Sequence, residues 1–112
     1  MSKSQRDRGK RGEREWALTL CAAGFPARRG VQYQGSVGSP DVICECLPFH
    51  HEVKRTEKLS LYSAMDQARS DCGENIPLVA HRRDHHEWLV IMRAEDWLAL
   101  VRESSYADGG RE

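Results

Sequence analysis

The strongest constraint on how this chain folds is a predicted hairpin. Its strands have the apolar pattern of buried strands, yet they carry charged residues. Residues 41–46 are largely apolar, residues 47–48 form a turn, and residues 49–55 (FHHEVKR) return as a second strand. Side chains alternate between the faces of a strand, which separates His50, Glu52 and Lys54 from Phe49, His51 and Val53. The hairpin therefore places two carboxylates, Asp41 and Glu52, and one ammonium group near the core.

The rest of the chain alternates between helical and strand patterns. Apolar residues recur at helical spacing over residues 12–23 and 59–72, which are followed by Gly24 and Gly73. Strand-like composition occurs at residues 31–34, 76–81 and 88–92, and a short helix is expected at 95–103. The order helix, three strands, helix, two strands, helix predicts an α/β fold with a mixed sheet of about five strands flanked by helices.

The 112 residues suffice for one domain with a modest core. We expect a flexible basic arm at residues 1–11, the domain at 12–103 and a disordered tail at 104–112. No apolar run approaches the ~18 residues of a membrane span, and the N-terminus is charged. These features predict a soluble cytoplasmic protein without a membrane partner, whose four cysteines remain reduced.

The charge of the chain is unevenly distributed. The net charge is zero, yet residues 1–37 carry eight Lys or Arg and three acids, whereas residues 38–112 carry nine and fourteen. A basic N-terminal part favours a polyanionic partner. A solvated tail that aids solubility explains the same pattern equally well.

The acids of the predicted hairpin suit a hard divalent cation. Mg²⁺ takes oxygen ligands and commonly binds one or two protein carboxylates together with phosphate. Asp41 and Glu52 could supply these two carboxylates. Lys54 faces the same side as Glu52, where it could orient or deprotonate a water or offset charge on phosphorus. Glu13 lies on the apolar face of the first helix, and Glu15 lies opposite. Buried acids are costly unless a cation or hydrogen bonds compensate.

Short motifs occur in a recognisable order along the chain: GER at 12–14, GF at 24–25, SPD at 39–41, EVK at 52–54 and QAR at 67–69. The ordered set resembles the PD-(D/E)xK nucleases, and most closely their archaeal-type Holliday junction resolvase branch, over roughly residues 10–92. The resemblance implies a restriction-endonuclease-like core. It also implies a homodimeric DNA endonuclease that uses Mg²⁺, with Mn²⁺ as a substitute, to hydrolyse phosphodiester bonds of four-way junctions in DNA recombination and repair.

The resemblance also implies roles for individual residues. Asp41 and Glu52 would be metal ligands, with the Val53 carbonyl as a candidate third. Lys54 would be the catalytic lysine, and the first and second helices would contribute Glu13 and Gln67. On this interpretation the DNA backbone would be contacted by Arg6, Arg8, Lys10, Arg11, Arg28, Arg29, Ser36 and Arg55, and binding would weaken steeply as salt rises.

Several alternatives remain open at this stage. The short hairpin and the short chain after the last helix also suit a structure-selective or nicking nuclease without preference for four-way junctions. A non-catalytic nucleic-acid-binding module would pair its acids with Lys54 and Arg55. A small zinc protein would use ligands among Cys44, Cys46, His50 and His51. The basic turn at 81–86 suits a solvated hairpin tip as well as a phosphate contact. His50 is expected to be solvated rather than part of a site. Core packing is expected for Trp16, Trp88 and Trp97.

Overall fold

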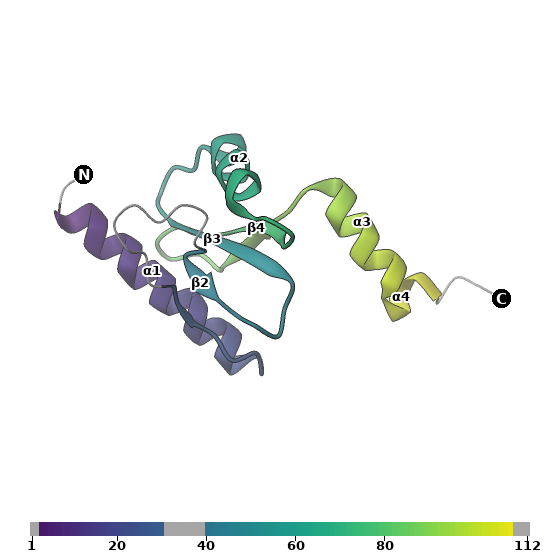
Figure 1. Ribbon diagram of the computed structural model, residues 1–112. Coiled ribbons are helices and arrows are strands. Elements are labelled where there is room, and N and C mark those ends of the chain that lie inside the picture. Colours follow the sequence, from purple (N-terminus) through teal and green to yellow (C-terminus); the bar gives the residue numbers. More distant parts are fainter. Residues whose placement is uncertain (1–2, 31–39, 109–112) are drawn as a thin grey trace.

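The fold is a five-stranded sheet with helices on both faces. The structure is a computed structural model that describes residues 3–30 and 40–108. The elements in chain order are α1 (Lys3–Ala22), β1 (Arg28–Arg29), β2 (Val42–Ile43), β3 (Phe49–Arg55), α2 (Leu61–Asp71), β4 (Ile76–Arg82), β5 (Leu89–Ile91), α3 (Ala94–Glu103) and α4 (Ser105–Asp108). The strands lie in the order β1-β2-β3-β4-β5 (Figure 1). The mixed five-stranded sheet predicted from the sequence is thus confirmed.

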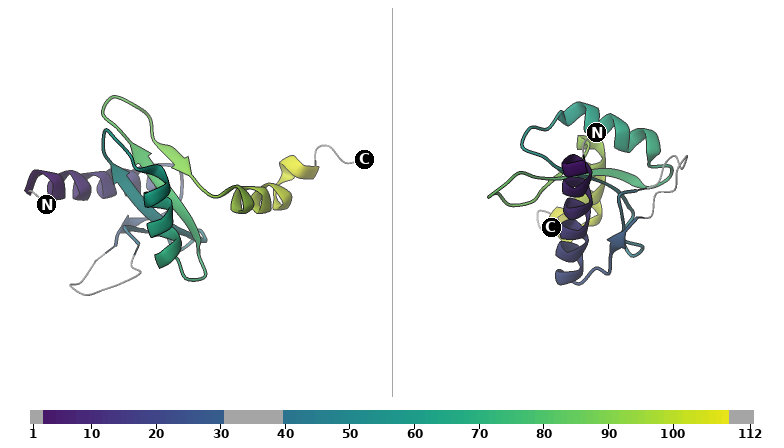
Figure 2. Two further views of the ribbon diagram at one scale, coloured as in Figure 1. Left: turned by 90° about the horizontal axis from the view of Figure 1, so that it is seen from above. Right: turned by 90° about the vertical axis from the view of Figure 1, so that its left-hand side faces the viewer.

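Helices α1 and α2 cover opposite faces of this sheet, as Figure 1 and Figure 2 show. The apolar half of α1 packs on β2, β3 and β4 in a cluster that includes Trp16, Leu20 and Leu78. The Trp16 ring also contacts Trp88, with ring centroids 5.1 Å apart. On the other face, α2 packs Met65 and its neighbours against Val79 of β4. The core is therefore split into two layers by the sheet.

Strand β3 is the centre of the sheet and is buried on both faces. It runs antiparallel to β2, with Val42 opposite His51, and parallel to β4 along its whole length. Helix α2 lies between β3 and β4 in the chain and provides the crossover that a parallel pair needs. Glu52 is only 4% exposed and His50 only 2%. His50 is thus not a solvated strand residue, which corrects that expectation.

Helix α1 begins at Lys3, not near Gly12. Residues 3–11 of the segment expected as a flexible arm therefore form a helical extension, in which Arg, Lys and Gln are good helix formers. Burial along α1 begins only at Gly12, so the extension lacks the apolar periodicity from which a helix is predicted. The expected tail also differs, because Ser105–Asp108 forms the short helix α4.

The first strands are shorter than expected. β2 contains only Val42–Ile43, because the chain turns directly afterwards, where the N–H of Leu47 donates to the carbonyl of Cys44 at 3.2 Å. β1 lies at Arg28–Arg29, and the expected strand at 31–34 falls outside the described residues. The remaining helices and strands lie close to their predicted positions.

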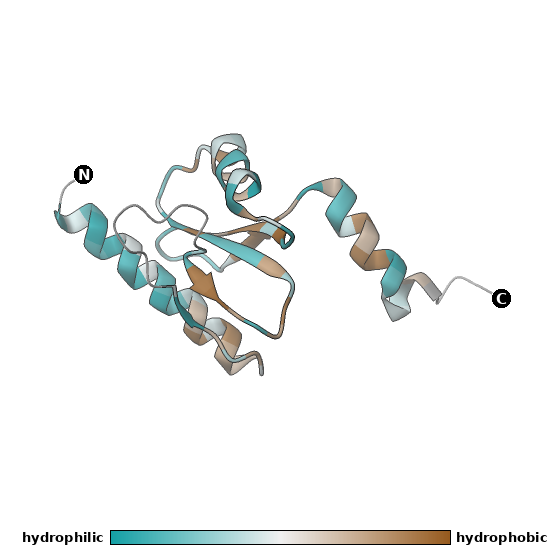
Figure 3. Cartoon of the chain, viewed as in Figure 1, coloured by the Kyte–Doolittle hydropathy of each residue, from teal (hydrophilic) through white to brown (hydrophobic). Residues whose placement is uncertain are grey.

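Helix α3 extends away from the sheet (Figure 1). Each of its residues is described, and none of them is buried. Trp97 is 55% exposed and Leu98 is 44% exposed, and Figure 3 shows hydrophobic residues along this isolated helix. The expectation that Trp97 packs in the core is therefore wrong. Over the part of the chain described, no helix is both long and apolar enough to cross a membrane.

Candidate functional site

A groove of about 750 Å³ brings the five residues expected at the active site to one place. Its lining includes Glu13 of α1, Asp41 just before β2, Glu52 and Lys54 of β3, and Gln67 of α2. These residues are far apart in sequence and come from elements on both sides of the sheet. The convergence of positions 41, 52 and 54, which the sequence interpretation requires, is therefore present in the fold.

Hydrogen bonds of both the main chain and the side chain hold Asp41 in place. Its N–H donates to the His51 carbonyl at 2.9 Å, and its own carbonyl accepts from the N–H of Gly30 at 2.9 Å. Position 30 needs glycine, because a Cβ there would collide with the carbonyl of Pro40. β3 continues past Val42, the first residue of β2, and the N–H of Val53 donates to Oδ2 of Asp41 at 2.8 Å. The carboxylate therefore lies at the open edge of β3.

Glu52 and Lys54 form the second part of the site. Nζ of Lys54 lies 3.4 Å from Oε2 of Glu52. The same ammonium donates to Oε1 of Gln67 on α2 at 3.3 Å. Because residues two apart on a strand face the same way, β3 sets the spacing of the acid and the amine, and α2 supplies the amide that orients the amine.

Glu13 reaches the groove because α1 crosses very close to β3. At Gly12 an added Cβ would collide with the side chain of Arg55, so glycine permits this approach of the two elements. The Oε1 atom of Glu13 accepts a hydrogen bond from Nε of Arg29 at 3.0 Å. Glu13 therefore lies on the inward face of α1, as expected from its position in the helix.

Burial and the charge of Asp41 raise the pKa of the other two acids of the groove, Glu13 and Glu52. Burial, together with a smaller contribution from the negative charge of Asp41, raises the pKa of Glu52 to about 7, and Lys54 acts in the opposite direction. Burial also raises the pKa of Glu13; the hydrogen bond from Arg29 lowers it, and Asp41 raises it again. The groove thus concentrates negative charge in a poorly hydrated place, which favours a bound cation.

The carboxylates of the groove fit Mg²⁺ better than a metal that requires many protein ligands. No group of three or more His, Cys, Asp or Glu side chains that could hold a metal occurs among residues 3–30 and 40–108. Two carboxylates, Asp41 and Glu52, remain as the donor pair in the groove. Mg²⁺ is commonly held by one or two carboxylates, with water and phosphate as the remaining ligands. The zinc alternative finds no such group in this part of the chain.

The basic residues expected to contact DNA fall into two groups. Arg6, Arg8 and Lys10 of the helical extension line the groove together with the acids, as does Arg29. Arg28 lies elsewhere, in an ion pair with Glu45 at 3.1 Å. Arg11 is exposed on α1 but is not part of the groove lining. Ser36 falls outside the described residues.

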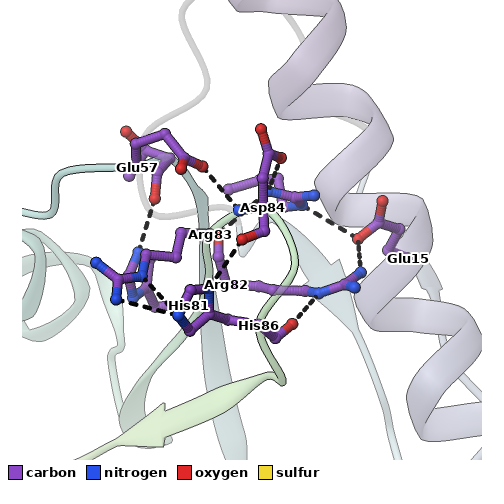
Figure 4. A network of polar contacts seen from close by, with 9 residues as sticks. Glu15, Glu57, His81, Arg82, Arg83, Asp84 and His86 are labelled. Carbon is purple, nitrogen blue, oxygen red and sulfur yellow. Dashed lines mark hydrogen bonds and ion pairs between the residues drawn. The ribbon is translucent and has the colours of Figure 1, made fainter.

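Arg55 lines the groove and is also engaged in ion pairs within the chain, and its contact with DNA stays a prediction. Its side chain is 9% exposed, with Nε 3.3 Å from Oε1 of Glu15 and Nη1 3.0 Å from Oδ1 of Asp84. Arg82 also reaches Glu15, at 3.0 Å. Figure 4 shows this network joining α1 to the β4–β5 hairpin. Glu15 thus pairs with two arginines. Its spacing along the sequence does not predict the pair with Arg82, because Arg82 lies in a distant strand.

The side chains and main chain of the turn at 81–86 make hydrogen bonds to residues close to the turn. The N–H of Asp84 donates to Oε2 of Glu57 at 2.7 Å, and Nε of Arg83 donates to Nε2 of His86 at 3.3 Å. His81 contacts the carbonyl of Thr56 through Nε2 at 2.9 Å. These contacts favour the hairpin-tip interpretation of the turn over a phosphate contact.

Comparison with known proteins supports this fold. No family model matches the chain, and no curated protein does. Among solved structures, the chain is similar to Archaeoglobus fulgidus Hjc, a Holliday junction resolvase from an archaeal hyperthermophile. The TM-score is 0.59 with 22% sequence identity, and the match covers 73% of this chain and 74% of that one. The resemblance to the resolvase branch is thus confirmed at the level of the fold.

Proposed function

We propose that this protein is a metal-dependent DNA endonuclease that hydrolyses phosphodiester bonds in branched DNA, as a Holliday junction resolvase does. The observation that carries the proposal is the convergence of Asp41, Glu52 and Lys54 in one groove, with Glu13 and Gln67 beside them. The fold shared with Archaeoglobus fulgidus Hjc supports the same assignment. Such cleavage would serve DNA recombination or repair.

The acids and the lysine would have separate tasks. Asp41 and Glu52 would hold Mg²⁺, or Mn²⁺ in its place, with the Val53 carbonyl as a third ligand. A bound divalent ion supplies Lewis acidity toward a phosphate oxygen and toward water. Lys54 would hold its ammonium against the charge that develops on phosphorus. Gln67 and Glu52 position that ammonium through contacts of 3.3 and 3.4 Å. Glu13, on α1, would orient a water in the same groove.

DNA would approach along α1. Arg6, Arg8 and Lys10 line the same groove as the acids, so a backbone held by these cations would run past the acid pair. Arg29 would face the same strand while it remains bonded to Glu13. Arg11, Arg28 and Ser36 stay as candidate contacts outside this groove. Phosphate contacts of this kind position DNA without reading its sequence.

A second copy of the chain would complete the enzyme, because cleavage of two strands calls for two active sites. Helix α3 is the candidate surface. It has ten residues, and helices of this length are marginal in water without tertiary contacts. The acids of its first turn, Glu95 and Asp96, pair with Arg93 of the same chain, which leaves the apolar residues as the unpartnered part of the helix. In an antiparallel two-fold pair of α3 helices, the exposed Trp97 and Leu98 would be covered.

Cleavage assays on matched substrates test the proposal. The same labelled strand is presented in a four-way junction, in a flap and in a linear duplex, with Mg²⁺ or Mn²⁺ present. A resolvase-like enzyme cuts the junction fastest. Equal cutting of all three would favour the nicking or structure-selective alternative. Binding without any cleavage of DNA or RNA would favour a non-catalytic module.

A further inference from the structure

Two thiols lie in contact in the turn between β2 and β3. The Sγ atoms of Cys44 and Cys46 are 3.6 Å apart, and both cysteines are free. In an extended strand, side chains two residues apart are separated by about 6.5 Å. Here the hydrogen bond from the N–H of Leu47 to the Cys44 carbonyl closes a turn and brings the two side chains together.

The two cysteines have different surroundings. Cys44 is 4% exposed and belongs to the core cluster beneath α1. Burial raises the pKa of its thiol, as does the neighbouring Cys46. Cys46 is exposed and lines a shallow pocket of about 430 Å³ together with Ala27, Arg28 and Glu45. A reagent in solution therefore meets Cys46 first, and Cys44 is held behind it.

We propose that Cys44 and Cys46 form a reversible dithiol–disulfide site whose reactant is a small-molecule disulfide. Cys46, as its thiolate, attacks one sulfur of the reactant and forms a mixed disulfide, and the first small thiolate leaves. Cys44 then loses its proton and attacks Sγ of Cys46, which expels the second small thiolate. The two cysteines lose two electrons and two protons, and the reactant is reduced to two thiols.

The geometry suits the second step. A disulfide joins its sulfur atoms at about 2.05 Å, so the pair must approach by about 1.5 Å. The turn holds the side chains on the same side, and Cys46 has open space through which it can rotate toward Cys44. Exposed disulfides within short loops are typical of reversible rather than structural bonds.

The other two cysteines have partners of their own, although Cys21 lies near the pair, since its partner Ala27 lines the same pocket as Cys46. The N–H of Ala27 donates to Sγ of Cys21 at 3.3 Å, and Sγ of Cys21 lies 3.3 Å from the carbonyl of Ala27. Cys72 follows α2 and donates to the carbonyl of Arg69 at 3.3 Å. The proposed site shares no residue with the lining of the acid groove. It can therefore be tested independently of nuclease activity.

The test exposes the full-length reduced chain to oxidised glutathione, stops exchange with acid, and measures the intact mass and the mapped peptides. The wild type is expected to lose two of its four thiols and the mass of two hydrogen atoms, with a bond between Cys44 and Cys46 that a reductant reverses. Cys46→Ser should keep Cys44 as a thiol. Cys72→Ser and Cys21→Ser are the matched controls and should form the same bond as the wild type.

The intermediate can be trapped in a second variant. In Cys44→Ser, Cys46 should retain glutathione as a stable adduct, because the resolving thiol is gone. If this core variant does not fold, Cys46→Ser decides alone. A stable glutathione adduct on Cys46 of the wild type would overturn the proposal, as would a disulfide that involves Cys21.

Discussion

The main-chain N–H of Val53 donates to the carboxylate of Asp41 at 2.8 Å. This bond joins the residue that precedes β2 to the strand that carries Glu52 and Lys54. It keeps a carboxylate at the point where β3 loses its β2 partner, so the two acids lie beside one groove. The relationship explains why a two-residue strand suffices to position half of the proposed metal site.

Removal of either part of the site should abolish cleavage and spare binding. Asp41→Asn removes a proposed metal ligand, and Lys54→Ala removes the ammonium that would face the phosphate. We expect each variant to lose at least about 100-fold in cleavage rate, while junction binding measured with Ca²⁺ remains largely intact. Glu45→Gln is the control, because Glu45 is exposed and pairs with Arg28 outside the groove. Wild-type cleavage rates in Asp41→Asn would contradict the assignment.

The pKa of Glu52 predicts how pH and metal act together on stability. Its pKa is about 7 in the folded chain and has an ordinary value of 4.5. Glu52 therefore costs stability increasingly as pH rises from about 4.5 to about 7, and on the order of 3 kcal/mol above that range. Without metal, thermal unfolding should show this loss, and Glu52→Gln should reduce it.

Mg²⁺ should offset the same cost where Glu52 is ionised. The increase in Tm on adding Mg²⁺ should thus be larger at pH 8 than at pH 5.5, and it should shrink in Glu52→Gln. Glu45→Gln again serves as the control. An increase that is equal at both pH values, or equal in Glu52→Gln, would show that the ion binds elsewhere.

His51 predicts a loss of stability in acid. Burial lowers its pKa to about 4 from an ordinary 6.5, and its Nδ1 accepts a hydrogen bond from the Trp16 indole at 3.0 Å. Its stabilising contribution is complete above pH 6.5 and is lost as pH falls through 4, by about 3 kcal/mol in total. Urea unfolding of His51→Gln should depend less on pH in this window than that of the wild type. The exposed-site control, His85→Asn, should show the same pH dependence as the wild type, because asparagine tolerates the positive φ of 63° at this position.

The sequence predicted the parts of the fold that depend on periodicity. The alternation in β3 correctly separated His51 and Val53 from Glu52 and Lys54, and helical spacing placed Glu13 inward. It could not reveal how long α1 is, because the extension is stabilised by helix propensity and buries nothing. It also missed the pairing of Arg55 with Glu15 and Asp84, which depends on how the β4–β5 hairpin packs against α1.

The exposed helix α3 shows a second limit of sequence patterns. An apolar stripe predicts that a helix is covered, but it does not say whether its own chain covers it. The stripe predicts that Trp97 lies in the core, whereas Trp97 is exposed. If a second copy covers α3, the apolar stripe does mark a buried helix face, but the residues that bury it belong to another chain.

Trp97→Lys tests this surface. Light scattering after gel filtration should give the mass of a dimer for the wild type and of a monomer for the variant, because a charge would be buried without a partner. Circular dichroism should stay nearly unchanged, since Trp97 contributes little to the core of its own chain. Tyr62→Lys, at an exposed position on α2, should remain dimeric. A monomeric wild type would remove α3 as a dimer surface.

The most direct test of the metal site is a crystal structure of the protein soaked with Mn²⁺. The anomalous signal of manganese identifies the ion independently of water and other light atoms. The account predicts a peak between the carboxylates of Asp41 and Glu52, at about 2.2 Å from an oxygen of each, and no peak there in Asp41→Asn. A groove without any peak, or a peak bound only at other residues, would contradict it.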